Sequence, residues 1–390
     1  MYLTSEEERI YDGELGWAYQ VSMRILTRLG ELFGATRLIP IASAHISGVS
    51  YKTIGDAPMS FLEEILNSGG KVKVSSTVNP AVFDLNRAKE MAISAEVIEK
   101  QMQIIDLYSN MGVNPTLTCT PYYSSKPASG SHLAWSESSA VIYANSILGA
   151  WTNREGGPSA LAAALIGKTP NYGMHQPEDR RPNVLVEVEP KLKKEIEFGA
   201  LGIYVGRMLG DRIPIFSGID GYTETNLKQL GAALASSGMT SIFYPDSKGE
   251  VKGLEKITIE KKDLRNTIEE LSTSSDPPDL VFIGCPHCSL KEIKRVATTL
   301  KGRKVSEDVK LWVCTSRHMR AKAERYVEMI ESAGGRVLCD TCVVVTWLDN
   351  LRVGTLITNS AKTAYYAPTF NRVKTVFKSM NQCIDAACED

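Results

Sequence analysis

The sequence predicts an α/β fold in which helices cover mainly parallel sheets. Short apolar runs rich in β-branched residues alternate with helical segments over the C-terminal half of the 390 residues, which is typical of parallel strands joined by crossover helices. Many of these runs stop abruptly at small or polar residues, as at Gly284. The chain exceeds the usual size of one domain, and its pattern changes to shorter units near residue 200. We therefore expect domains over 1–200 and 201–390.

The composition excludes several classes of function. The net charge is −1, so nothing points to nucleic acid or an anionic membrane as a partner. No apolar run approaches the ~20 residues that a membrane-spanning helix needs. The first nine residues are polar and acidic and lack the layout of a signal peptide, so we expect a cytoplasmic protein. In that reducing compartment, the eight cysteines serve metal binding or catalysis more often than disulfides.

The N-terminal half is predicted to contain three strands that run into polar loops. Thr4 and Glu7 have the spacing of a capping box, which begins a helix over 6–33 that can break at Gly13 or Gly16. The loop that contains Gly48 is small and polar, so it is either a cradle of N–H groups for an anion or an ordinary connection. Strands are expected over 38–42, 72–76 and 116–120, and helices over 61–68, 88–112, 140–148 and 160–166.

In the C-terminal half, three successive strands end in thiols. The strand over 280–283 leads to Cys285, the next leads to Cys314, and the third, over 336–339, leads to Cys339 and Cys342. Because parallel strands place their carboxyl ends along one edge of a sheet, we expect these thiols to be neighbours. Further strands are expected over 213–217, 240–244, 257–259, 310–314 and 353–358, and helices over 226–236, 262–272, 290–300 and 320–332.

The cysteines allow three kinds of site. Cys285 with Cys288 and Cys339 with Cys342 form two Cys-x-x-Cys pairs, which is the spacing of a four-cysteine zinc site. The first pair also precedes a helix that Ser289 can cap, as a thiol redox motif would. Widely spaced thiols gathered by a fold can instead hold an iron–sulfur cluster with one open iron. A structural turn is the remaining interpretation of the first pair.

Four motifs, in their order along the chain, resemble those of one family. They are Thr118-Cys119-Thr120-Pro121-Tyr122, Gly284-Cys285-Pro286-His287-Cys288-Ser289, Asp340-Thr341-Cys342 and Thr358-Asn359-Ser360-Ala361-Lys362. Together they resemble the large subunit of aconitase X, a branch of the aconitase superfamily of iron–sulfur dehydratases. The resemblance extends from the loop at His45 to Tyr366. It implies an aconitase-like fold with two or more αβα-type domains.

The resemblance also implies a reaction and a partner. The family has a fused type, which dehydrates cis-3-hydroxyproline and carries a C-terminal swivelling domain, and an archaeal type split into two subunits. The split type dehydrates (R)-5-phosphomevalonate to trans-anhydromevalonate 5-phosphate in an archaeal mevalonate pathway. This chain ends at Asp390 without room for the swivelling domain, so we expect the split type with a small swivelling-domain subunit. The alternatives are a dehydratase of another hydroxy acid, such as cis-3-hydroxyproline, and a non-catalytic α/β scaffold protein stapled by zinc.

The family's motifs assign candidate site residues in this sequence. The ligands of a 4Fe–4S cluster, or of a 3Fe–4S cluster after loss of the open iron, would be Cys119, Cys285 and Cys342, with Cys288 and Cys339 as competitors. Lys362 would bind substrate or stabilise the developing enolate. The base would come from the partner, from Glu137 or from a nearby hydroxyl such as Ser138. The substrate residues would be Gly48, Val49, Ser50, Asn79, Pro80, Glu137, Ser138 and Lys362.

Several residues keep two interpretations. His287 either tunes the cluster through an outer hydrogen bond or packs in a turn. Arg317 is a candidate for the substrate phosphate, and Arg154 for a carboxylate, although either can be a surface arginine. We assign no function to Cys383 and Cys388.

Overall fold

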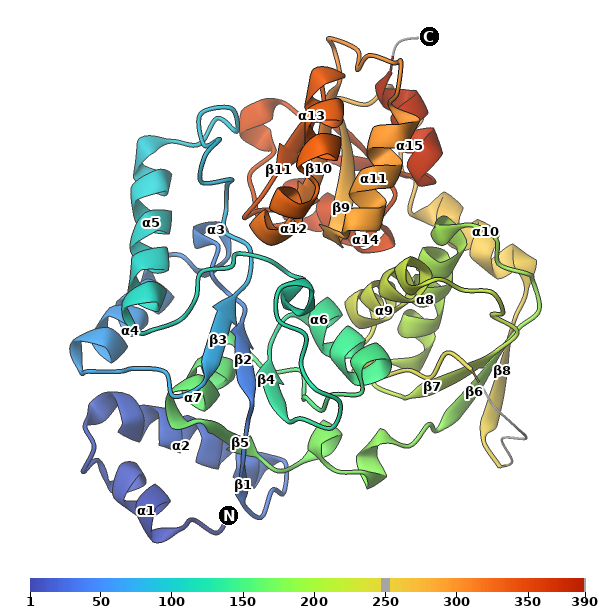
Figure 1. Cartoon of the computed structure of the whole chain (residues 1–390). Coiled ribbons are helices and arrows are strands. Elements are labelled where there is room, and N and C mark those ends of the chain that lie inside the picture. The colour runs from blue at the N-terminus through green and yellow to red at the C-terminus, as the bar shows by residue number, and fades with distance from the viewer. Residues whose placement is uncertain (247–252, 389–390) are drawn as a thin grey trace. The chain divides into compact units, whose positions relative to one another are not determined.

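The computed structural model describes residues 1–246 and 253–388 (Figure 1). The chain divides into two compact units. Unit 1 consists of Met1–Ala81 and Ser94–Arg181, and unit 2 of Val82–Ile93 and Pro182–Asp390. The short segment Val82–Ile93 therefore packs with the C-terminal half of the chain, although its sequence neighbours on both sides belong to unit 1.

Unit 1 begins with two helices where one long helix was expected. Helix α1, Ser5–Asp12, starts at the predicted capping box of Thr4 and Glu7 and ends at Gly13, which has a φ of 95°. Helix α2, Trp17–Leu32, starts after Gly16, which also has a φ of 95°. The break lies at the predicted glycines because only glycine adopts this left-handed backbone without strain.

A three-stranded parallel sheet positions the polar loops of unit 1. Its strand order is β3-β2-β4, with β2 (Ser43–Ile46) between β3 (Ser75–Val78) and β4 (Leu133–Trp135). A separate antiparallel pair joins β1 (Leu38–Pro40) to β5 (Lys168–Pro170). The helices of this unit are α3 (Tyr51–Ile54), α4 (Asp56–Asn67), α5 (Ala95–Asn110), α6 (Ser138–Tyr143) and α7 (Gly157–Ile166), with a π-helical segment (Ala144–Leu148) and 3-10 turns at Pro121–Tyr123, Gly173–His175 and Glu178–Arg180.

Three expectations for unit 1 were wrong in detail. The segment 116–120 is not a strand, since Leu117 has a φ of 45° and only Asn114 forms a bridge, to Thr77. The helix expected over 88–112 begins only at Ala95, because Ser94 accepts a hydrogen bond from the N–H of Val97 and Ala92 has a positive φ. The strand expected over 38–42 ends at Pro40 as β1, and a second strand, β2, begins at Ser43.

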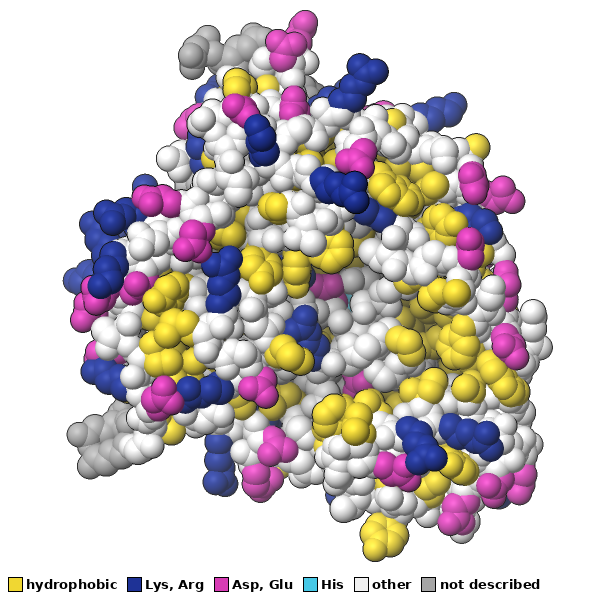
Figure 2. Space-filling view, turned by 180° about the vertical axis from the view of Figure 1, so that it is seen from behind, with side chains coloured by type: hydrophobic (Ala, Val, Ile, Leu, Met, Phe, Trp, Pro, Cys, Tyr) yellow, Lys and Arg dark blue, Asp and Glu magenta, His cyan; other side chains and the backbone are white. Residues whose placement is uncertain are grey.

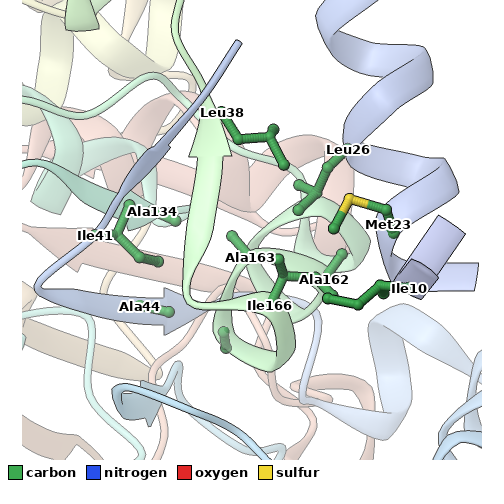
Figure 3. Close-up of a cluster of buried hydrophobic side chains, with 11 residues drawn as sticks. Ile10, Met23, Leu26, Leu38, Ile41, Ala44, Ala134, Ala162, Ala163 and Ile166 are labelled. Carbon is green, nitrogen blue, oxygen red and sulfur yellow. The ribbon is translucent and has the colours of Figure 1, made fainter. Parts of the chain in front are cut away.

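Small residues on α7 bring the helices of unit 1 close to its sheet. Met23 and Leu26 of α2 face Ala162, Ala163 and Ile166 of α7 across a buried cluster (Figure 3). Every residue of α7 from Ser159 to Ile166 is buried, and its alanines let backbones approach where larger side chains would not fit. This core holds the N-terminal end of α7 beside the Gly48 loop, where a Cβ on Gly157 would lie 2.6 Å from the carbonyl oxygen of Ser47.

Unit 2 contains two parallel sheets. The smaller has the order β7-β6-β8, from β6 (Val184–Val188), β7 (Pro214–Ser217) and β8 (Glu255–Ile259). Its helices α8 (Glu195–Leu209) and α9 (Glu224–Ser237) pack closely, because a Cβ on Gly202 would lie 2.5 Å from the Cβ of Ala233. Helix α10 (Lys261–Glu270) follows β8. The segment 240–244, expected as a strand, forms only a bridge between Tyr244 and Ile215.

The larger sheet of unit 2 has five parallel strands in the order β11-β10-β9-β12-β13. Helices follow the strands in turn, as the alternating sequence pattern predicted. The strands are β9 (Leu280–Cys288), β10 (Lys310–Thr315), β11 (Arg336–Leu338), β12 (Thr355–Thr358) and β13 (Lys374–Phe377). The helices are α11 (Leu290–Thr299), α12 (Arg317–Lys322), α13 (Glu324–Ser332), α14 (Ala361–Asn371) and α15 (Met380–Ala387), with a 3-10 turn at Asp349–Leu351.

Strand β9 is longer than the sequence predicted, because it includes the thiol motif. Gly284 has a φ of 121°, and a Cβ there would lie 2.3 Å from the carbonyl oxygen of Cys314 on β10. The register between β9 and β10 shifts at this point, so that Thr315 pairs with Cys288. An extended strand can therefore continue through residues that normally end one.

The surface carries charges of both signs. On the face shown in Figure 2, Lys and Arg side chains are interspersed with Asp and Glu, as the net charge of −1 leads one to expect. Among the described residues, we find no helix with the length and apolar character that crossing a membrane requires.

Candidate functional site

The carboxyl edge of the five-stranded sheet gathers the thiols of unit 2. Cys285, Cys288, Cys314, Cys339 and Cys342 are all buried and free. Burial raises the pKa of Cys314 well above its ordinary value, and the thiols of Cys342, Cys288 and Cys339 add to the rise. The prediction that these thiols are spatial neighbours is therefore confirmed within unit 2.

The surroundings of Cys342 include groups that stabilise a thiolate. Burial raises its pKa to about 12, and the nearby thiol of Cys285 contributes to the rise. The backbone N–H groups of Val345 and Val344 and the ammonium group of Lys362 act in the opposite direction. Lys362, in the first turn of α14, is 9% exposed, so its charge acts in a poorly solvated place. The structure thus brings together three predicted site residues, Cys285, Cys342 and Lys362.

In the two Cys-x-x-Cys pairs, Cys288 and Cys339 each lie near a carboxylate. Burial raises the pKa of Cys288, and the carboxylate of Glu292 adds to the effect while Lys228 opposes it. Burial raises the pKa of Cys339 to about 12, with further contributions from Asp340 and Asp84. A redox thiol needs a lowered pKa, so these surroundings give no support to the redox interpretation of the Cys285 and Cys288 pair.

His287 joins the two cysteine loops of unit 2. Its ring is fully buried, and Nε2 lies 2.9 Å from the carbonyl oxygen of Thr341, the residue before Cys342. Nε2 of His287 donates this hydrogen bond, since a carbonyl oxygen only accepts. The hydroxyl oxygens of Thr341 and Thr363 are buried with no hydrogen-bond partner among the described residues. Polar atoms of this kind are rare in folded proteins and indicate a missing partner.

Arg317 has partners that sequence reasoning did not find. Its Nε lies 2.9 Å from Oδ1 of Asp340, a second nitrogen contacts Oδ2 of the same carboxylate, and Asp84 lies 3.4 Å away. Asp84 also accepts a hydrogen bond of 2.7 Å from the N–H of Cys339. This cluster holds the Asp340 loop, where φ is 63°, and it occupies the guanidinium expected to bind phosphate. Arg154 is exposed beside β4.

The loops of unit 1 that carry the other candidate residues follow its three strands. Val49 and Ser50 are buried, and Gln101 of α5 fixes their loop with bonds of 3.0 Å to the carbonyl oxygen of Val49 and from the N–H of Tyr51. Gly48 has a φ of 77°. A buried glutamine that satisfies two backbone groups makes this loop rigid.

Asn79, Pro80, Glu137 and Ser138 follow the neighbouring strands of the same sheet. Nδ2 of Asn79 donates a hydrogen bond of 2.6 Å to Oε2 of Glu137. Oε1 of Glu137 accepts a hydrogen bond of 3.0 Å from the hydroxyl of Ser139. Pro80 is buried, and Ser138 is the first residue of α6, which Glu137 caps. The structure therefore joins Asn79 and Glu137 directly.

Cys119 lies beside the end of β3. The N–H of Thr118 donates a hydrogen bond of 3.2 Å to the carbonyl oxygen of Val78, the last residue of that strand. The thiol of Cys119 is buried, with only 7% of the residue exposed. Among the residues that the structure describes, no three His, Cys, Asp or Glu side chains form a group that holds a metal ion as placed.

Two buried residues near these sites were missed from the sequence. His45 on β2 contacts Asn79, and Lys228 on α9 binds Glu292 beside Cys288. A lone histidine in a polar loop and a lysine on a helix carry no spacing signal, so only their burial in the fold reveals them.

Comparison with known proteins covers almost the whole chain. It matches the family models of the aconitase X first domain over residues 1–178, second domain over 182–269 and third domain over 278–389. The phosphomevalonate dehydratase large subunit of Methanothermobacter thermautotrophicus is 48% identical over 94% of both chains. That of Methanocaldococcus jannaschii is 44% identical over 98% of this chain and 99% of its own.

Two further proteins complete the comparison. The cis-3-hydroxy-L-proline dehydratase of Hypocrea jecorina is 32% identical over 99% of this chain but 68% of its own length. The crystal structure of Thermococcus kodakaraensis aconitase X in its holo-form superposes with a TM-score of 0.93 and 42% identity, covering 99% of this chain and 100% of that one. The predicted aconitase-like α/β fold is confirmed. The chain belongs to the aconitase X family and is an enzyme of the hydro-lyase class.

Proposed function

We propose that this chain is the large, catalytic subunit of an iron–sulfur hydro-lyase that converts (R)-5-phosphomevalonate to trans-anhydromevalonate 5-phosphate in an archaeal mevalonate pathway. The observation that carries the proposal is the identity of 44–48% with phosphomevalonate dehydratase large subunits along almost the entire chain. The hydroxyproline dehydratases are more distant, at 32–33% identity. A small swivelling-domain subunit is the proposed partner.

The chemistry of the donor set fits an iron–sulfur cluster. Cys119 of unit 1, with Cys285 and Cys342 of unit 2, would hold it, as the family's motifs imply. Support comes from the N–H groups and the Lys362 ammonium beside Cys342, since hydrogen bonds and positive charge stabilise bound thiolates. Cys288 and Cys339 face carboxylates and are the weaker candidates. When bound, a 4Fe–4S cluster with one iron free of cysteine supplies a Lewis acid for the leaving hydroxyl.

The residues of the chain supply binding and charge. The rigid loop of Gly48, Val49 and Ser50 offers backbone N–H groups to an anionic part of the substrate. Asn79 and Glu137 form a hydrogen-bonded pair at the neighbouring strand ends, and Ser138 stands next to them. Pro80 restricts the backbone after Asn79. These groups would orient the substrate.

Removal of a proton next to the substrate carboxylate builds up negative charge, which Lys362 would stabilise from its poorly solvated position. The base is the second requirement. Both carboxylate oxygens of Glu137 already accept hydrogen bonds, from Asn79 and Ser139, and donors that stabilise a carboxylate make it a weaker base. We therefore place the base on the partner, with Glu137 or the Ser138 hydroxyl as the alternatives within this chain.

The decisive experiment is a substrate comparison. The chain would be expressed anaerobically with a small swivelling-domain subunit, reconstituted with iron and sulfide, and mixed with (R)-5-phosphomevalonate or cis-3-hydroxy-L-proline. We expect NMR to show loss of water from the phosphomevalonate only. Turnover of the hydroxyproline alone would reverse the choice of substrate, and a colourless protein that retains zinc would contradict the cofactor.

A further inference from the structure

A chain of hydrogen bonds in unit 1 leads from a fully buried histidine to Glu137. His45 on the central strand β2 is 0% exposed. Its Nδ1 lies 2.8 Å from Oγ1 of Thr77, and its Nε2 lies 3.3 Å from Oδ1 of Asn79. Asn79 then donates to Oε2 of Glu137 at 2.6 Å. The ring also makes an edge contact with Trp135, with 6.1 Å between the ring centroids.

The donor and acceptor of each hydrogen bond in this series follow from the Glu137 carboxylate at its end. The oxygens of an ionised Glu137 only accept, so Asn79 must present its amide N–H to them. The amide oxygen of Asn79 is then left facing His45, and it also only accepts. Nε2 of His45 must therefore carry the ring hydrogen. Burial lowers the pKa of His45 to about 4, so the neutral ring has one N–H, and Nδ1 accepts from the Thr77 hydroxyl.

All three hydrogen bonds run in the same direction: Thr77 donates to His45, His45 donates to Asn79, and Asn79 donates to Glu137. Hydrogen bonds that run in one direction polarise one another, which strengthens the last bond in the series. His45 and Glu137 favour the same orientation of the Asn79 amide, one from each side. Without a donor at Nε2, the Asn79 oxygen loses this hydrogen-bond partner and the amide is held from the Glu137 side only.

We propose that His45 is a positioning residue for the substrate site, which fixes the Asn79 amide so that its N–H holds the carboxylate of Glu137. This inference depends on the proposed function in one respect, that Asn79 and Glu137 contact the substrate. It adds a residue that would touch neither substrate nor cofactor and would act through its hydrogen bond to Asn79.

The variants that test it differ only in the donor. His45→Leu removes the ring and its N–H, whereas His45→Gln keeps an amide N–H that can reach Asn79. Loss of an outer hydrogen bond of this kind lowers activity by about 10- to 100-fold. We expect that loss in kcat/KM for His45→Leu and recovery of most of it in His45→Gln. Thr77→Val, which removes the donor to Nδ1 only, should have a smaller effect.

His132 provides a matched control in the same unit. Its Nδ1 lies 2.9 Å from Nδ1 of His175, and its ring makes a similar edge contact with Trp151, at 5.6 Å between centroids. No hydrogen bond that we observe joins it to Asn79 or Glu137. His132→Leu and His132→Gln should leave kcat/KM close to that of the unaltered complex.

The measurement is steady-state kinetics of the reconstituted complex, with iron content and melting temperature determined for each variant. Lost activity in His45→Leu, with iron and melting temperature retained and with rescue by His45→Gln, supports the proposal. Full activity in His45→Leu, or loss of iron together with activity and no rescue, overturns it.

A second measurement stands apart from turnover. Long-range ¹H–¹⁵N spectra of the full chain labelled at histidine should show the hydrogen of His45 on Nε2, and a hydrogen on Nδ1 would overturn the inferred orientation. If the unaltered complex does not act on (R)-5-phosphomevalonate, the proposed function fails while this spectrum still tests the hydrogen-bond chain.

Discussion

Cys285 and Cys288 stand three residues apart on one strand, yet their surroundings differ. Burial raises the pKa of Cys288 and the Glu292 carboxylate adds to the rise, while Lys228 opposes it. Burial, Asp340 and Asp84 raise the pKa of Cys339 to about 12, while Arg317 and Arg320 oppose the rise. Burial also raises the pKa of Cys342 to about 12, while two backbone N–H groups and Lys362 oppose it. The family's motifs, together with Lys362 beside Cys342, lead us to propose Cys285 and Cys342 as the cluster ligands.

This assignment gives a prediction for alanine variants reconstituted anaerobically. Loss of a ligand should remove most of the bound iron, whereas loss of a neighbouring thiol should not. All these thiols are similarly buried, so the substitutions disturb the packing to a similar extent and differ mainly in the loss of a ligand. Iron and sulfide analysis measures the outcome. We expect large losses in Cys119→Ala, Cys285→Ala and Cys342→Ala, and near-normal iron in Cys288→Ala, Cys339→Ala and Cys383→Ala.

Cys383 is the most informative control in this series. It is 0% exposed on α15, and its Sγ contacts the carbonyl oxygen of Lys378 at 3.7 Å. Equal iron content in Cys119→Ala and Cys383→Ala would contradict the ligand assignment.

At the scale of elements, an ion pair without access to water joins α9 to α11. Nζ of Lys228 lies 2.5 Å from Oε2 of Glu292, and both side chains are almost fully buried, at 1% and 6% exposure. Nζ also donates to the carbonyl oxygen of His287 at 3.2 Å, and Glu292 completes the capping box with Ser289. One lysine therefore ties the second and third family domains together beside the Cys288 motif.

Breaking this pair should destabilise unit 2 strongly. Lys228→Met leaves the Glu292 carboxylate buried without its cation, which costs about 3–5 kcal/mol. Lys374→Met is the control, because its pair with Asp276 is 60% and 55% exposed and such pairs contribute about 0–1 kcal/mol. Urea unfolding of the two variants measures the difference, and equal midpoints would show that the buried pair does not hold the elements together.

At the scale of the whole molecule, chain length separates the two kinds of relative. The chain covers 94–99% of the phosphomevalonate dehydratase large subunits described above, but 68–70% of the hydroxyproline dehydratases. The curated names of the former include a large subunit, which implies a smaller one.

The partner should therefore control turnover. We expect the reconstituted chain alone to be brown but inactive toward (R)-5-phosphomevalonate, because the proposed base lies on the partner. Titration with the small subunit should raise the rate until one partner is present per chain, with the small subunit alone as the control. An unchanged rate on addition of partner would place the base in this chain, at Glu137 or Ser138.

Local signals in the sequence determined the fold class and many elements. The apolar run over 280–283, Gly284 and the capping residue Ser289 predicted a strand and a helix that the structure contains as β9 and α11. Parallel connectivity then predicted that the thiols of successive strands are neighbours, which holds in unit 2. The motifs also identified the family, because their order along the chain is specific.

Contacts between distant residues were decided by the tertiary structure alone. Asn79 and Glu137 are 58 residues apart, and Lys228 and Glu292 are 64 apart, so no local pattern pairs them. The approach of Gly284 to Cys314 extends β9 through its thiol motif, against the local signals of glycine and proline. Sequence patterns report a residue's own backbone preference and burial, whereas the partner of a buried polar group depends on which strands the fold places side by side.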